Sequence, residues 1–181
     1  MKTHGCQIFL FLIVFILSSF SACEEPDPTI LPAETQSGKN TFGCYVNNEL
    51  FVGGFANLMG PKAFNASYSK INNGIGIMVS GVLNSNFKTG RDIFIEVLSI
   101  KTDSTMQINN VFCYNMNEFY PYFVANKSGE IYITKLDTIN KIVSGRFKFT
   151  AMSADWKRNL VDNDSIVVSN GRFDLELEII N

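Results

Sequence analysis

From Thr41 to the end of the chain, apolar and polar side chains alternate with a period of two residues in several short runs. In the clearest run, which ends the chain, the apolar residues Phe173, Leu175, Leu177 and Ile179 alternate with Arg172, Asp174, Glu176 and Glu178. Successive side chains of a strand point to opposite faces of a sheet, so this run predicts a strand with one buried and one solvated face. The acids of the polar face are accordingly expected in water.

Similar runs recur along the chain, separated by Asn, Gly and Ser, the residues that form tight turns. No window from residue 41 onward shows the 3.6-residue period of an amphipathic helix. About 8–10 short strands joined by such turns predict an all-β fold, either an antiparallel β-sandwich or a flattened barrel. Residues 41–181, roughly 140 in all, are enough to bury one core, so we expect a single β domain.

Residues 1–22 have the pattern of a signal peptide. Lys2 supplies a positive charge, and Ile8 to Leu17 is an unbroken apolar run of ten residues. Such a run is too short to span a bilayer but matches the helical core of a signal peptide. The alternative is a permanent N-terminal membrane helix, but the small residues from Ser18 to Ala22 favour a cleaved leader.

The end of this leader, Phe20-Ser21-Ala22-Cys23, resembles the lipobox of bacterial lipoproteins. The resemblance implies that the chain is cut before Cys23 and that the Cys23 thiol carries the lipid that anchors the protein to the membrane. Glu24, Glu25 and Asp27 resemble the acidic signal that sends lipoproteins of Bacteroidota to the cell surface. We therefore expect a lipid-anchored protein of the outer membrane, exposed on the cell surface or, alternatively, facing the periplasm.

Residues 23–40 differ in composition from the rest of the chain. They contain Pro26, Pro28 and Pro32, scattered acids, and no sustained period of two or 3.6 residues. This composition predicts a flexible, disordered acidic linker that holds the domain away from the lipid surface.

The chain contains four cysteines. Cys6 leaves with the leader and Cys23 is the expected lipid site, so Cys44 and Cys113 remain. In an oxidising compartment this pair forms either a disulfide or two buried thiols that pack as small apolar groups, and the sequence leaves both alternatives open.

The single histidine is His4, within the leader, so the expected mature chain has none. This excludes a Ser-His-Asp triad, a Cys-His dyad and a histidine-ligated zinc ion. Residues 162–164, Asp-Asn-Asp, lack the rest of a calcium loop and are read as a polar turn. We expect no enzyme, no metal and no cofactor; an enzyme here would depend on carboxylates, Lys or Tyr.

The formal net charge is −2, so no basic field is available for a nucleic-acid partner.

The main ligand-binding candidate is the aromatic block from Phe112 to Phe123, with Tyr114, Tyr120 and Tyr122, together with the single tryptophan, Trp156. Aromatic rings beside Asn and Glu suit sugar stacking, although core packing and a wet sheet face are the commoner use.

Residues Gly38–Cys44, Gly129–Asp137, Val143–Ala151 and Asn170–Asp174 resemble a family of uncharacterised Bacteroidota lipoproteins, known as a domain of unknown function. The resemblance implies a secreted β-rich domain and transfers no activity. Two of these segments share a Gly-Arg-Phe repeat, which we read as two similar sheet corners.

We therefore rank a non-catalytic binding or structural lipoprotein first, with a glycan or an envelope protein as its partner. A carbohydrate-binding module comes second and a carboxylate-based hydrolase third.

Overall fold

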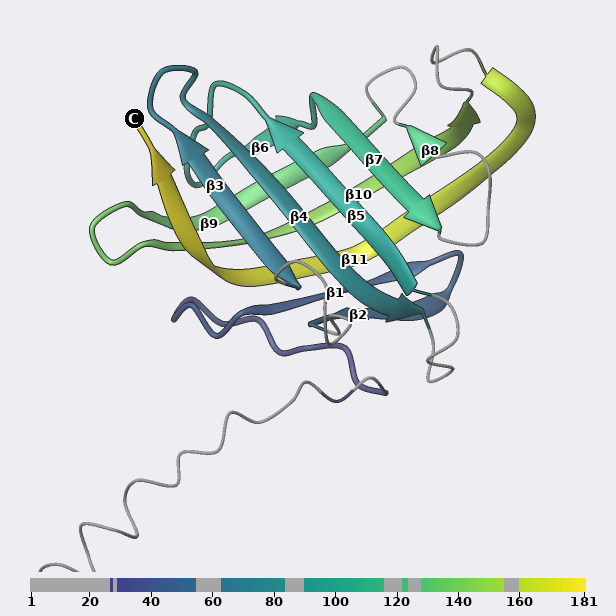
Figure 1. Ribbon diagram of the computed structural model, residues 1–181, viewed down its shortest axis with the longest axis horizontal. Coiled ribbons are helices and arrows are strands. Elements are labelled where there is room, and N and C mark those ends of the chain that lie inside the picture. Colours follow the sequence, from purple (N-terminus) through teal and green to yellow (C-terminus); the bar gives the residue numbers. More distant parts are fainter. Residues whose placement is uncertain are drawn as a thin grey trace, which may run out of the picture.

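The protein is a flattened β-barrel (Figure 1). The computed structural model describes residues 27, 29–54, 63–83, 90–115, 122–123, 128–154 and 160–181, and these contain strands and turns but no helix. The predicted all-β fold is confirmed. The predicted signal helix lies outside the described residues.

The described residues form eleven strands. They are β1 (Thr41–Val46), β2 (Glu49–Gly53), β3 (Phe64–Ser69), β4 (Gly74–Leu83), β5 (Gly90–Val97), β6 (Thr105–Gln107), β7 (Asn110–Asn115), β8 (Tyr122–Phe123), β9 (Glu130–Asp137), β10 (Ile142–Ala154) and β11 (Leu160–Ile180). The total of eleven slightly exceeds the predicted 8–10 strands because it includes two very short strands, β6 and β8.

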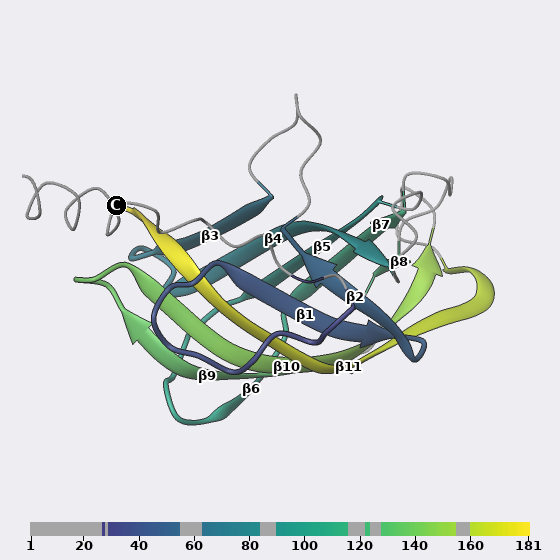
Figure 2. The same ribbon diagram turned by 90° about the horizontal axis from the view of Figure 1, so that it is seen from below.

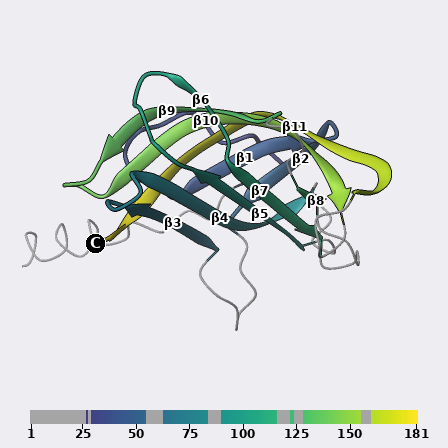
Figure 3. The ribbon, with the colours of Figure 1, turned by 90° about the horizontal axis from the view of Figure 1, so that it is seen from above.

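Two layers face each other across the core (Figure 3). One contains β9, β10, β11, β1 and β2, and the other contains β3, β4, β5 and β7. The layers join at both sides, because β8 pairs with both β7 and β10, and β11 pairs with β3. The β11–β3 pair is parallel, in contrast to the predicted antiparallel pattern. It forms because the long β11 continues past β10 and reaches the other layer.

Strands β10 and β11 form the longest pairing of the barrel, from Ile142 opposite Glu176 to Ala154 opposite Leu160. Residues 162–164, read from the sequence as a polar turn, therefore belong to a strand. A register shift in this pairing coincides with the positive φ of Asn170, 51°, as expected for a β-bulge.

The Gly-Arg-Phe repeat is one paired motif in the middle of the sheet rather than two separate corners. Gly145 on β10 lies opposite Phe173 on β11, and Phe147 lies opposite Gly171. A Cβ at Gly171 would lie 2.6 Å from the Phe147 ring, and one at Gly145 would lie 2.8 Å from the Phe173 ring. Each glycine therefore makes room for the phenylalanine of the other strand.

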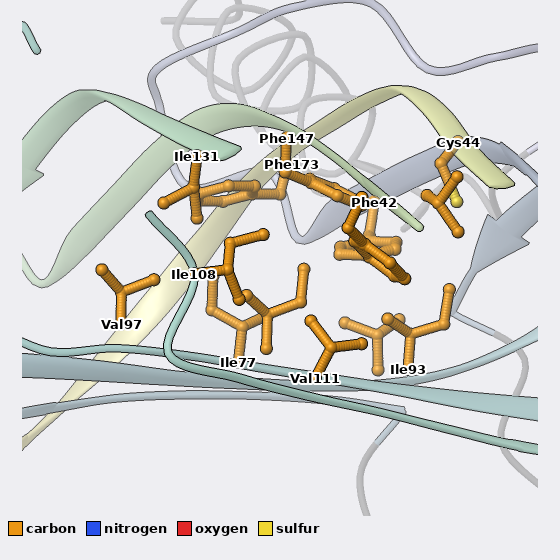
Figure 4. Packing of buried hydrophobic residues seen from close by; sticks show 14 of the residues in the cluster. Phe42, Cys44, Ile77, Ile93, Val97, Ile108, Val111, Ile131, Phe147 and Phe173 are labelled. Atoms are coloured by element: carbon orange, nitrogen blue, oxygen red, sulfur yellow. The ribbon is translucent and has the colours of Figure 1, made fainter. Parts of the chain in front are cut away.

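The core is filled by aliphatic and aromatic side chains from both layers (Figure 4). Phe147 is at the centre of its aromatic part, with its ring centroid 5.0 Å from Phe42, 6.1 Å from Phe149 and 6.2 Å from Phe173. Because these residues are buried in alternate positions along their strands, the predicted inward faces are confirmed for Phe147, Phe149 and Phe173.

Candidate functional site

The second half of the expected linker lies on the barrel. Residues 29–40, which we call the strap, cross the outer face of β11 and β10 (Figure 2). The Nζ of Lys135 on β9 donates a hydrogen bond of 3.0 Å to the Gln36 carbonyl oxygen. The backbone N–H of Glu176 on β11 donates one of 2.9 Å to Oδ1 of Asn40. Attachment to the barrel thus begins before the expected domain boundary at residue 41.

Asp174 fixes the strap. Its carboxylate accepts five hydrogen bonds: from Thr35 Oγ1 (2.6 Å), Ser37 N (3.0 Å), Gly38 N (2.8 Å), Lys39 N (3.3 Å) and Ser144 Oγ (2.7 Å). Asp174 is only 1% exposed, so the expectation that it is solvated was wrong. The alternation pattern correctly assigned Asp174 to the outer face of the sheet. The strap covers Asp174 on that face, so its carboxylate is buried.

The charge of Asp174 is stabilised by those donors. Burial acts to raise the pKa of Asp174, but the hydrogen bonds from the strap and from Ser144 outweigh it and lower the pKa from 3.8 to about 2. Asp174 is therefore a negatively charged structural anchor at neutral pH.

Beside the strap, a groove of about 310 Å³ opens on the outer face of β9, β10 and β11. It is lined by Glu34, Thr105, Glu130, Ile131, Tyr132, Arg146, Phe147, Lys148, Asn170, Gly171 and Arg172. We call it the arginine groove. Its volume is at the lower end of the range for small-molecule sites.

One cross-strand row runs along the groove. Thr105 on β6 pairs with Tyr132 on β9, Tyr132 pairs with Arg146 on β10, and Arg146 pairs with Arg172 on β11. Directly paired residues share a face of the sheet, so the two arginines occupy neighbouring positions on the outer face. Both arginines come from the Gly-Arg-Phe repeat, whose glycines and phenylalanines fix this register.

Arg146 has two partners. Its Nε lies 3.3 Å from Glu34 Oε2 of the strap, and its Cζ lies 5.9 Å from the centre of the Tyr132 ring. The side chains of Arg146 and Glu34 are 58% and 49% exposed, so water weakens this ion pair. The Arg146 side chain is therefore oriented by two contacts, and its ion pair with Glu34 is weak.

The side chain of Arg172 has fewer partners among the described residues than that of Arg146. Its Nε is buried and makes no hydrogen bond, and none of the described carboxylates lies within ion-pair distance of it. A buried donor without an acceptor costs about 1–3 kcal/mol. The other cation of the groove, Lys148, forms an ion pair of 3.0 Å with Glu130. Three cations thus meet two carboxylates here, and Arg172 carries the uncompensated charge.

Of the residues chosen from the sequence, those that the structure describes do not line this groove. Cys23, Tyr120 and Trp156 lie outside the described residues. Tyr114 of β7 lies opposite Asp92, and Tyr122 of β8 lies opposite Cys113. Since Cys113 and Tyr114 are consecutive, this register assigns Tyr114 and Tyr122 to positions on opposite faces of the sheet.

Cys44 and Cys113 are thiols in the structure, rather than the disulfide that was one of the two alternatives. Both belong to the core, 0% and 6% exposed. Burial, and secondly the nearby Cys113, raise the pKa of Cys44 well above its usual value of 9.0. Such a thiol is a poor nucleophile and a poor metal ligand.

No cluster of three or more His, Cys, Asp or Glu side chains suited to a metal ion occurs within the described part of the chain. The described residues likewise contain no helix that is long and apolar enough to cross a membrane. The groove itself offers guanidinium, ammonium, phenol and amide groups, a set suited to holding an anion.

Sequence reasoning missed Arg146, Arg172 and Glu34 as site residues. The available signal was the arginine inside each copy of the Gly-Arg-Phe repeat. Comparison of the chain with protein-family models, with curated proteins and with solved structures found no match. Membership of the Bacteroidota lipoprotein family therefore stays a prediction.

Proposed function

We propose that this protein is a lipid-anchored, non-catalytic binding protein of the outer membrane, exposed on the cell surface, and that it binds its partner in the arginine groove. Lipid attachment at Cys23 is supported by the leader and the lipobox-like sequence. The binding role is supported by the groove, which offers charged and aromatic groups on a rigid sheet.

The observation that carries the proposal is a pair of neighbouring arginines, one of which lacks a counter-ion among the described residues. Arg146 and Arg172 are direct cross-strand neighbours, and the buried Nε of Arg172 has no acceptor. Like charges in this position repel, and an unpaired buried donor costs free energy. A bound anionic partner would offset the repulsion between the two arginines.

The barrel interior is a poor alternative site. Its side chains form one continuous apolar core, with Phe42, Phe51 and Ile95 fully buried. A small barrel filled in this way leaves its outer surface for binding.

Two experiments test the proposal. Cys23→Ala should abolish palmitate labelling and release the protein from membranes, and unchanged labelling would contradict the lipid anchor.

For the groove, the detergent-solubilised full-length lipoprotein should bind components of a glycan array, and Arg146→Gln should reduce that binding. An array without hits, or hits that Arg146→Gln leaves unchanged, would argue against a binding role for this groove.

Glycan capture is the favoured form of this function. The aromatic block first suggested it, and Tyr132 on the groove now supports it independently, because an aromatic ring offers a flat apolar surface for a sugar.

A further inference from the structure

We propose that the arginine groove recognises a carboxylated sugar, a hexuronate unit, and that Glu34 of the strap occupies part of the carboxylate subsite in this structure. This inference rests on the proposed binding function and names its ligand class.

The arginine pair selects an anion with fixed geometry. Arg146 and Arg172 lie side by side on adjacent strands, held in register by the glycine–phenylalanine pairs on either side of them. Two guanidinium forks on a rigid sheet match the two oxygens of a planar carboxylate. The buried Nε of Arg172 makes no hydrogen bond, and no described carboxylate neutralises the charge of this guanidinium.

Glu34 shows that a carboxylate fits against Arg146 at the edge of the pair. It comes from the strap and lies 3.3 Å from Arg146 Nε. The strap is fastened one residue further along, where Thr35 donates its hydrogen bond to Asp174. Glu34 is thus held at the groove, where it competes with a ligand for Arg146. Its ion pair with Arg146 is exposed and therefore weak enough for a ligand carboxylate to replace Glu34.

The rest of the groove favours a sugar over a bare anion. Tyr132 places an aromatic ring beside Arg146, and Thr105 and Asn170 offer uncharged hydrogen-bonding groups. A pyranose ring combines C–H faces that pack on an aromatic ring with hydroxyl groups that pair with such side chains. The volume of about 310 Å³ suits a small ligand of this kind rather than a folded partner.

Calorimetric titration of the full-length lipoprotein with digalacturonate tests the inference. The acid should bind, and its uncharged methyl ester should bind at least tenfold more weakly, because it loses charge-assisted hydrogen bonds. Arg172→Gln should weaken binding of the acid by a similar factor. Glu34→Gln should strengthen it by about two- to fivefold, since removing an exposed ion pair frees Arg146.

Lys70→Gln is the matched control, because Lys70 is an exposed cation outside the groove whose Nζ contacts Asn181. Lys70→Gln should leave the affinity for digalacturonate unchanged. If it weakens binding as much as Arg172→Gln does, only the overall charge of the protein matters, and the inference is overturned. Equal binding of the acid and the ester, or inorganic phosphate binding as tightly as digalacturonate, would also overturn it. If the array detects only neutral glycans, bound through Arg146, the proposed function stands and the hexuronate inference fails.

Discussion

Replacing Asp174 by asparagine tests whether one buried carboxylate fastens the strap to the barrel. The substitution keeps the size of the side chain but removes its charge. Three backbone N–H groups of the strap and two hydroxyl groups would then face an amide in place of a carboxylate that accepts from all five. We expect the folded protein to lose stability at neutral pH.

The magnitude follows from the pKa of Asp174. A fall from 3.8 to about 2 on folding corresponds to roughly 2 kcal/mol of stability. Water reaches the outer side of the strap, so we expect a measured loss of about 1–2 kcal/mol. For a domain of this size, that lowers the melting temperature by roughly 2–8 °C.

The pH dependence has a definite sign. Because folding lowers the pKa of Asp174, its contribution is fully present above pH 3.8 and is lost as the pH falls toward 2. Wild-type stability should therefore fall through this window. The difference between wild type and Asp174→Asn should shrink there.

Urea unfolding followed by circular dichroism measures the stability, and hydrogen exchange of the Ser37, Gly38 and Lys39 amides reports on the strap. Glu178→Gln is the matched control, an exposed acid on the same face of the same strand. It should change stability by less than about 0.5 kcal/mol. If Asp174→Asn behaves like this control and the strap amides stay protected, the reasoning about Asp174 is refuted.

Three further predictions concern the core. Phe147→Ala should cost about 3–5 kcal/mol in urea unfolding, because the ring is 4% exposed and packed among other aromatic rings; a loss below 1 kcal/mol would contradict this packing. Gly171→Ala should cost about 1–3 kcal/mol because its Cβ would meet the Phe147 ring at 2.6 Å, whereas Gly76→Ala meets nothing closer than 3.5 Å and should cost less; equal losses would argue against the steric explanation. Cys44 and Cys113 should react with a thiol reagent only after unfolding, and rapid reaction of the native protein would show that they are accessible.

The sequence by itself determined the fold class and the inward faces of the strands. Phe173, Leu175 and Leu177 are buried as their alternation predicted, because the two-residue period of a strand is a local property of the backbone. The Asn, Gly and Ser residues between the runs likewise predicted tight turns, and one such turn is at Asn47 and Asn48, where both residues have positive φ.

Only the tertiary structure decided which strands are neighbours and what covers their outer faces. Alternation placed Asp174 on the polar face, but whether that face meets water or the strap depends on contacts between residues more than 130 positions apart. The arginine groove has the same origin. Arg146 and Arg172 are far apart in the chain, and they become neighbours only through the register of β10 with β11, which the two glycine–phenylalanine pairs fix by packing.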